Sequence, residues 1–263
     1  MADGLGVTLY FRNGGSGSVW MDDFKVEPIT GTLPEGVQLG KTYPVNPPAS
    51  DVVLRWNGKG AEDAVLDESG YGHHGKFFGG VSWTTDNGRR VISLNGTNTY
   101  IWPLCSPALR LQPPYTFVLD IKPESGGPLM FWGWNFYWHL TGSAPKLGIG
   151  YQLHAGTYTI TSSQPFLTTG QWHKVVLVVA TNQFRVFCDG KFIETVKADS
   201  KAGDWGLYCT STWHRHMSFF GAGPGNMTLT KDNPTAGIKG SVGAFTVYNR
   251  GLTDQEIAAM GGY

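Results

Sequence analysis

Two neighbouring stretches of this sequence combine aromatic and polar side chains in a pattern that suits sugar binding. The first, residues 130–140, reads MFWGWNFYWHL, and alternate residues of a β-strand point to opposite faces. One face carries Phe131, Gly133, Asn135, Tyr137 and His139. An aromatic surface flanked by planar hydrogen-bonding groups can stack on sugar C–H groups and bond their hydroxyls. Asn135, Tyr137 and His139 are therefore candidate carbohydrate-binding residues.

The opposite face of the same stretch is uniformly large and apolar. It carries Trp132, Trp134, Phe136, Trp138 and Leu140. Burial removes a large apolar area from water for each of these side chains, so the pattern favours a place in the core over a role in ligand binding.

The next strand, predicted over Lys146–His154, extends the polar face. Its core-facing positions are expected to be Leu147, Ile149, Tyr151 and Leu153. Gln152 and His154 then lie on the other side, where an adjacent strand would place them beside Tyr137 and His139. The alternative interpretation is a sheet face that is simply solvated.

One further aromatic residue lies in a loop-like stretch, where Trp213 is followed by His214, Arg215 and His216. An exposed Trp beside His and Arg suits contact with a polysaccharide, and the loop could close a groove at a sheet edge. The alternative is a Trp side chain that packs its loop onto the core.

Metal ligands are sparse in the sequence. Asp67 is a candidate calcium ligand, because Ca²⁺ takes carboxylate oxygens together with the carbonyls of a turn. His73 and His74 are adjacent, so in a strand they would point in opposite directions, and no third ligand has a matching spacing. We interpret the two histidines as loop residues.

The elements that would position these residues are strands. Tyr115–Lys122 alternates apolar and polar residues, and His173–Ala180 is apolar on both faces, which is typical of a central strand covered twice. Val91–Leu94 and Thr99–Trp102 are two short strands, with the turn signal Asn95-Gly96 between them. Helical signal is confined to the end, where a capping box over residues 253–256 predicts one short helix.

Three motifs in order carry a family resemblance. They are D-x-S-G-x-G-x-x-G with G-V-x-W from Asp67, GQWHKV with its Asp189-Gly190 turn, and GSVGAFTVYNRGLTDQE from Gly240. Together these motifs resemble the laminin-G-like domains of the concanavalin A-like superfamily. The resemblance implies an all-β fold, a two-sheet antiparallel jelly-roll sandwich, that often binds sugar as an accessory module. The family often places a second acid in its closing strand, where this chain has Val242-Gly243-Ala244, so the family's calcium ligand set is incomplete here.

The domain organisation follows from the same motifs. Residues 51–263 are predicted to form the laminin-G-like jelly roll. Residues 1–28 contain GSVWMDDFKVEP, which resembles the C-terminal hairpin of a preceding β-sandwich module; the alternative is a hairpin docked on the main domain. Residues 29–50 are rich in Pro and Gly, as linkers are. The start reads as a fragment boundary without a signal peptide, so an extracellular or cell-surface location rests on the resemblance.

Composition limits the partners. The sequence has 20 Lys and Arg residues and 20 Asp and Glu residues, so it has no net positive charge to attract nucleic acid or anionic lipid. No apolar run approaches the ~20 residues that a membrane span needs. Three cysteines, Cys105, Cys188 and Cys209, give no metal spacing, and either three buried thiols or one bridge with a free thiol fits them.

The function that these patterns favour is a non-catalytic carbohydrate-binding module of a larger secreted or surface polysaccharide-processing protein. Its partners would be a glycan and the neighbouring domains of the same polypeptide. The carboxylate triplet E-x-D-x-x-E of related sugar hydrolases is absent from the sequence. A jelly-roll polysaccharide lyase with Tyr or His as proton-transfer group is the enzymatic alternative, and a structural or adhesion spacer is the third.

Overall fold

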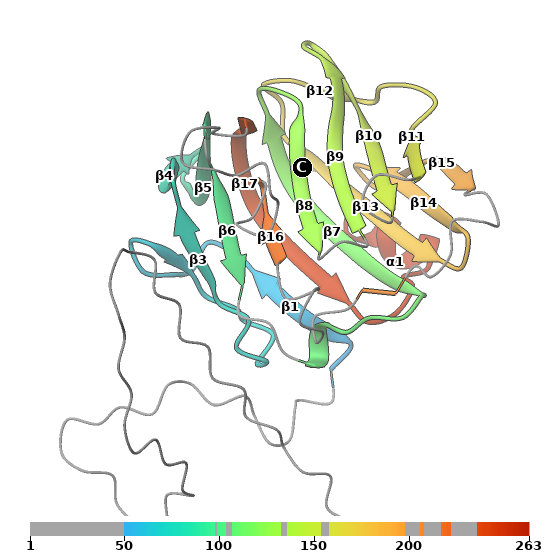
Figure 1. The fold of residues 1–263 in the computed structure, drawn as a ribbon, viewed down its shortest axis with the longest axis horizontal. Coiled ribbons are helices and arrows are strands. Elements are labelled where there is room, and N and C mark those ends of the chain that lie inside the picture. The colour runs from blue at the N-terminus through green and yellow to red at the C-terminus, as the bar shows by residue number, and fades with distance from the viewer. Residues whose placement is uncertain are drawn as a thin grey trace, which may run out of the picture. The chain divides into compact units, whose positions relative to one another are not determined.

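The structure of the protein, a computed structural model, describes residues 50–262 except 98, 104–106, 133–135, 154–157, 198–205, 208–216 and 222–235. At 107, 151–153, 158–160, 217–219 and 236 only the backbone is described. The predicted N-terminal hairpin, 1–28, and nearly all of the predicted linker, 29–50, lie outside these residues and stay predictions. Within the described residues the expected fold is confirmed: antiparallel strands form two sheets, and one short helix follows near the C-terminus (Figure 1).

The first sheet, sheet A, has eight strands. In spatial order it contains β15 (Lys191–Lys197), β14 (Gln183–Cys188), β13 (His173–Ala180), β7 (Tyr115–Pro123), β17 (Ala236–Tyr248), β5 (Arg89–Thr97) and β4 (Val81–Asp86). β1 (Val52–Trp56) pairs with the second half of β17, while β5 pairs with the first half. The long strand β17 therefore holds both of them against β7 on its other side.

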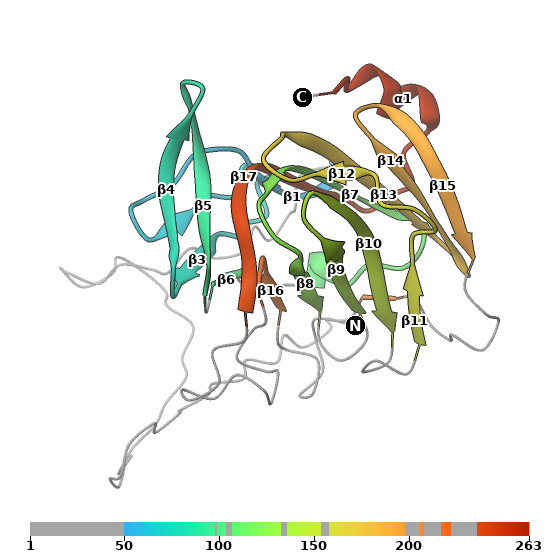
Figure 2. The ribbon, with the colours of Figure 1, turned by 90° about the horizontal axis from the view of Figure 1, so that it is seen from above.

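The second sheet, sheet B, has nine strands. In spatial order it contains β11 (Tyr158–Thr161), β10 (Lys146–Leu153), β9 (Phe136–Ser143), β8 (Gly127–Trp132), β16 (Met217–Phe219), β6 (Tyr100–Pro103), β3 (Gly75–Phe78) and β2 (Ala64–Val65). β12 (Leu167–Thr168) pairs with β10. A short 3₁₀ helix, η1, spans Pro107–Leu109. Figure 2 shows β13 and β14 in one layer and β8, β9 and β10 in the other.

The core lies between the two sheets and follows the alternation of the strands. On β7 the odd-numbered side chains Tyr115, Phe117, Leu119 and Ile121 are buried in this core, as the sequence predicts. On β13, Val175, Leu177 and Val179 face the core, while Val176 and Val178 join a second cluster on the outer face of sheet A. The prediction of a central strand covered on both faces is therefore confirmed.

The C-terminal helix α1 (Asp254–Ala259) covers that second cluster. Thr253 caps the helix in the predicted capping box, in which its side chain accepts from the Glu256 N–H and the Glu256 carboxylate accepts from the Thr253 N–H. Ile257 packs with Val118, Val176 and other outer side chains of sheet A. α1 thus lies beyond β14 and β15, on the side of sheet A away from sheet B (Figure 2).

The predicted turn at Asn95-Gly96 is wrong. These residues lie inside β5, with Gly96 at a φ of 82°, and β5 and β6 belong to different sheets. The Asn95 side chain accepts from the Thr97 N–H (2.9 Å), which suits a chain that bends out of one sheet toward the other. The hairpin turn of this region is Asn87-Gly88, between β4 and β5, with both residues at positive φ.

Candidate functional site

The β8–β9 hairpin of sheet B presents two of the predicted binding residues on the face directed away from the core. The core side holds Trp132, Phe136, Trp138 and Leu140, each at most 3% exposed. Tyr137 and His139 alternate with these residues and are half-buried on the outer face. The predicted division of this strand into two faces is therefore confirmed for the residues that the structure describes; Trp134 lies outside them.

Strand pairing brings a third predicted residue to the same place. In the β9–β10 ladder Gln152 lies opposite Tyr137, and Gly150 lies opposite His139, so both pairs share the outer face (Figure 1). The side chain of Gln152 is not described, and its position comes from this register alone. Asn135, His154 and Trp213, the other predicted binding residues, lie outside the described residues and stay predictions.

The rings of Tyr137 and His139 are parallel within 4°, with centroids 6.2 Å apart. This separation is close to the distance between residues i and i+2 of a strand, about 6.7 Å. Phe131 of β8 packs edge-on against Tyr137 at a centroid distance of 4.7 Å, which fixes the orientation of the phenol ring. The three side chains thus form one preorganised aromatic group.

This part of the outer face is more covered than the sequence predicts. Phe131 is only 2% exposed and Gly150 is buried, although both belong to the outward series. Alternation sorts side chains by face, and it carries no information on what lies over a face. Tyr137 and His139 accordingly offer partial ring surfaces to a ligand.

Burial also sets the protonation of this group. It raises the pKa of Tyr137 to about 12 and lowers the pKa of His139, because the charged form of each loses hydration. Tyr137 is therefore a neutral phenol and His139 a neutral imidazole at pH ~7. The His139 Nε2 atom is covered and has no hydrogen-bond partner among the described residues, so a water molecule or a ligand hydroxyl would stabilise it.

A second aromatic group lies on the same outer face, and sequence reasoning missed it. Phe78 of β3 stacks on Tyr100 of β6 (4.7 Å between centroids, 8° between planes) and lies 6.1 Å from Trp102. The three side chains are half-buried, while Phe77 and Ile101 between them face the core. The period-2 alternation in Gly75–Phe78 and Tyr100–Pro103 indicates on which side of each strand these rings lie, but not that the strands belong to the same sheet as β9.

The register of sheet B joins the two groups. From β6 the order is β16, β8 and β9, with Ser218 opposite Phe131 and Phe131 opposite Tyr137. Three strand spacings of about 4.8 Å separate β6 from β9, or roughly 14 Å. We call this surface the sheet B aromatic face; its described side chains are Phe78, Tyr100, Trp102, Phe131, Tyr137 and His139.

Asp67, the predicted calcium ligand, anchors the loop that carries it. One carboxylate oxygen accepts from the N–H groups of Arg55 (2.8 Å) and Ser69 (2.9 Å). The other accepts from the Ser69 hydroxyl (2.7 Å) and the His73 N–H (2.9 Å). These four donors occupy the directions in which the carboxylate would bind a cation, so the carboxylate does not fit a calcium site in this arrangement.

The two adjacent histidines belong to the same structural loop. His73 is completely buried, donates from Nδ1 to the Val53 carbonyl (2.6 Å), and stacks on Tyr71. His74 accepts the Asp67 N–H at its Nδ1 (2.9 Å). The prediction that they are loop residues is correct, and the structure adds that His73 holds this loop to β1.

A hollow on the outer face of sheet A is the second candidate site. Its volume is about 300 Å³, and its lining includes Arg55, Asp120, Lys174 and Tyr248. Asp120 is buried and forms an ion pair with Lys174 (2.5 Å). The exposed Arg55 adds a positive charge beyond this ion pair, so the hollow is lined by a net positive charge.

The sequence profile of a known family, the concanavalin A-like lectin/glucanases superfamily of laminin-G type, matches residues 112–258. No curated protein sequence matches the chain. Among the described residues, no helix is long and apolar enough to cross a membrane.

Several solved structures share the fold. Domain 4 of AbnA, an extracellular GH43 arabinanase from Geobacillus stearothermophilus solved with arabinotriose, is 15% identical (TM-score 0.54; 80% of this chain and 98% of that one). The binding domain of Paraclostridial Mosquitocidal Protein 1 is 15% identical (TM-score 0.58), and the botulinum neurotoxin type G receptor-binding domain is 11% identical (TM-score 0.56). Each toxin match covers 80% of this chain, which spans about half (51%) of either toxin domain.

Proposed function

Because this chain belongs to the concanavalin A-like lectin/glucanases superfamily, we propose that it is a non-catalytic carbohydrate-binding module whose glycan lies on the sheet B aromatic face. The observation that carries the proposal is the pair of ring groups on this face, one around Tyr137 and one around Tyr100. Aromatic rings held by their neighbours provide apolar contact for sugar C–H groups with little loss of side-chain entropy. The arabinotriose bound to the arabinanase domain supports the choice of glycan as the ligand class.

The charge of this face favours a neutral glycan. The described parts of β8 and β9 contain no Lys or Arg, and the Lys in β10, Lys146, lies four residues from Gly150 and donates to Thr168 (2.9 Å). The exposed Lys76 of β3 lies opposite Trp102 and forms an ion pair with Asp63 (3.2 Å), so this pair adds no net charge to the face. The net charge of the whole chain is also zero. Stacking and hydrogen bonds between neutral groups are short-ranged, so we propose weak, salt-insensitive binding that gains retention from repeated sugars.

A polysaccharide lyase is the second candidate, because the neutral His139 could accept a proton from a sugar carbon. Such a reaction also needs a group that neutralises the carboxylate of a uronate substrate. The described residues that flank Tyr137 and His139 provide no cation for this purpose, and Tyr137 with a pKa of about 12 is a poor base at neutral pH. Binding without catalysis is therefore the better-supported function.

The cellular setting that fits this function is a secreted or surface protein in which the module delivers other domains to a polysaccharide. The extracellular arabinanase, whose fourth domain shares this fold, supports that setting. A spacer domain without a ligand is the third candidate, and it predicts no glycan binding by any measurement.

The experiment is a glycan array and affinity electrophoresis with neutral and uronate polysaccharides, in parallel with ultraviolet detection of unsaturated products. Retardation without product formation supports the binder, while product formation supports the lyase. Tyr137→Ala and Trp102→Ala should weaken retardation, and Arg55→Ala, on the opposite sheet, is the matched control. No retardation and no product in any assay would refute glycan binding and favour a spacer domain.

A further inference from the structure

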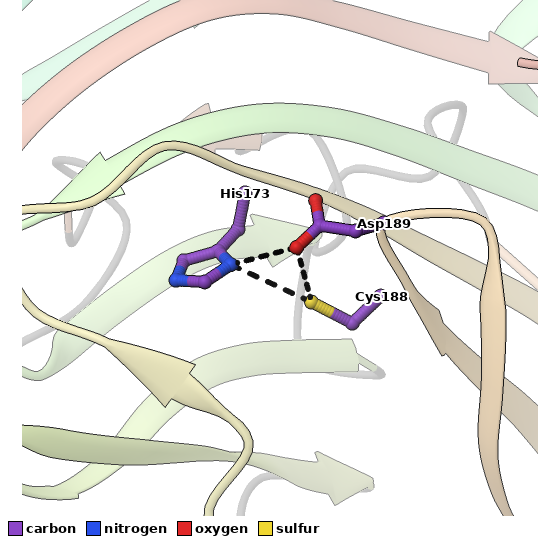
Figure 3. Close-up of side chains that lie close together, drawn as sticks. All are labelled: His173, Cys188 and Asp189. Carbon is purple, nitrogen blue, oxygen red and sulfur yellow. Dashed lines mark hydrogen bonds and ion pairs between the residues drawn. The ribbon is translucent and has the colours of Figure 1, made fainter. Parts of the chain in front are cut away.

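Three side chains of types that can bind a metal ion lie close together at one end of the β13–β14 hairpin of sheet A. His173 begins β13, Cys188 ends β14, and Asp189 is the first residue of the tight turn that follows. The Asp189 Oδ2 atom lies 3.0 Å from His173 Nδ1 and 3.5 Å from Cys188 Sγ, and Sγ lies 3.7 Å from Nδ1 (Figure 3). All three ligand atoms therefore face a common point.

We propose that His173, Cys188 and Asp189 form a binding site for zinc or a similar transition metal, with a fourth position for water. A thiolate, an imidazole and a carboxylate are the ligand types that Zn²⁺ accepts, and the thiolate selects against calcium and magnesium. The proposal does not depend on the glycan-binding function.

The distances fit tetrahedral coordination. With Zn–S near ~2.3 Å and Zn–N and Zn–O of about 2.0–2.2 Å, tetrahedral angles place neighbouring ligand atoms roughly 3.3–3.6 Å apart. The observed separation of 3.5 Å lies within that range, and those of 3.0 and 3.7 Å lie outside it by a few tenths of an ångström. Small side-chain adjustments would therefore complete the site.

The groups around the three ligands orient them for a metal. The Lys174 N–H donates to Asp189 Oδ1 (2.8 Å), which leaves Oδ2 directed at the cluster. The ring of His173 has both the N–H and the carbonyl of Thr168 beside Nε2, at 3.0 and 3.3 Å. A histidine that binds metal through one nitrogen commonly donates its other ring N–H to a backbone carbonyl, and the Thr168 carbonyl provides that acceptor.

The proton balance of metal binding follows from these contacts. Without metal, Nε2 accepts the Thr168 N–H, so Nδ1 carries the ring proton and donates it to Asp189. On binding, Nδ1 becomes the ligand, and a proton on Nε2 donates to the Thr168 carbonyl. Cys188 must lose its thiol proton, because the thiolate is the ligand.

The other two ligands differ in whether they have a proton to release. Burial alone would raise the pKa of Asp189, but hydrogen bonds from Lys174 and His173 outweigh it and keep this carboxylate ionised. Burial, together with the Asp189 carboxylate, raises the pKa of the Cys188 thiol to about 12. Metal binding therefore releases the Cys188 proton, because the thiolate is the ligand.

Access to the site is through Asp189. The His173 and Cys188 side chains are buried, while the Asp189 side chain is 35% exposed.

Because Thr168 belongs to β12, which pairs with sheet B, the His173 contact also joins the two sheets at this end. Bound metal should therefore raise the melting temperature.

The test is a titration of the full chain with Co²⁺, which reports a thiolate ligand by a sulfur-to-metal charge-transfer band, followed by displacement with Zn²⁺. Cys105→Ser/Cys209→Ser leaves Cys188 as the only thiol and should keep the band. Cys188→Ser should abolish the band and weaken zinc binding by roughly 100-fold or more. The zinc affinity of the Cys105→Ser/Cys209→Ser chain should rise at least about tenfold per pH unit near neutrality, because the thiol proton must be released.

Three outcomes would overturn the proposal. The first is a chain that binds no Co²⁺ or Zn²⁺ while folded by circular dichroism. The second is a charge-transfer band that survives Cys188→Ser or disappears in Cys105→Ser/Cys209→Ser. The third is an affinity independent of pH.

Asp189→Asn, which keeps the turn but removes the carboxylate charge, is the second variant: it should lower the zinc affinity at least 10-fold without changing the fold.

Discussion

Replacing Trp138 by alanine should destabilise the domain by about 3–5 kcal/mol, the range for truncation of a large aromatic side chain in a core. Trp138 is 1% exposed, lies between the two sheets, and packs on Phe117 with ring centroids 5.9 Å apart and planes 29° from parallel. Truncation removes these contacts and leaves a cavity that a close-packed β core fills only in part.

The expected shift in melting temperature follows from the size of the domain. For 150–250 residues, a loss of 1 kcal/mol lowers the melting temperature by roughly 2–4 °C, so the expected shift is about 6–20 °C. Urea unfolding followed by far-ultraviolet circular dichroism measures the free energy directly. Tyr137→Ala, one residue away and half-buried on the other face, is the matched variant and should lose clearly less stability.

The reasoning would be refuted if Trp138→Ala lost less than ~1 kcal/mol while Tyr137→Ala lost more. That result would mean that the two faces of β9 are exchanged, as a slip of one residue in the strand register would produce.

Four other predictions concern pH, the calcium candidate and the N-terminus. Burial lowers the pKa of His73, so its folded pKa lies below the unfolded value of about 6.5, and stability should fall as pH drops through this value. Equal urea midpoints at about pH 7.5 and pH 5 would contradict this prediction. The Glu256 pKa is about 2 because Arg250 and Thr253 donate to its carboxylate, so Glu256→Gln should be less stable than wild type at neutral pH, with a difference that vanishes as pH falls from about 4.5 to 2. Asp67→Ala leaves backbone N–H donors without acceptors and should lower the free energy of unfolding by about 1–3 kcal/mol for each buried donor. Calcium or a chelator should not change the wild-type melting temperature, and a clear rise with calcium would restore the metal prediction. Deletion of residues 1–28 should leave the melting temperature of the main domain unchanged, and a large drop would show that they belong to it.

The sequence predicts most of the sandwich because burial imposes period 2 on its strands. The predicted strand His173–Ala180 has the bounds of β13, and the predicted side of Tyr115 on β7 is correct. The faces of Trp138 and Tyr137 were also assigned correctly, since large apolar side chains at alternate positions have one low-energy arrangement.

Long-range pairing sets the limit of such prediction. Asn95-Gly96 carries the local signal of a hairpin turn, yet its two flanking strands find partners in different sheets. The Asn87-Gly88 turn has the same signal and does form the hairpin, so sequence alone does not separate the two. Competition between pairings distant in the sequence decides the outcome.

The candidate site was predictable in composition and less so in exposure. Tyr137, His139 and the register position of Gln152 could be placed together because they lie on adjacent strands. Phe78 and Trp102 join the same face from strands far away in sequence, and the burial of Phe131 depends on what covers the sheet. Neither fact is encoded in local alternation.

The measurement that tests the glycan-binding account most directly is calorimetric titration of the best array glycan into wild type, Tyr137→Ala and Arg55→Ala at low and moderate salt. The account predicts that Tyr137→Ala weakens binding roughly 2- to 12-fold, the equivalent of about 0.5–1.5 kcal/mol for an aromatic contact. Arg55→Ala and the change in salt should have little effect. Binding that is lost in Arg55→Ala, unchanged in Tyr137→Ala and steeply weakened by salt would place the ligand on sheet A and contradict the account.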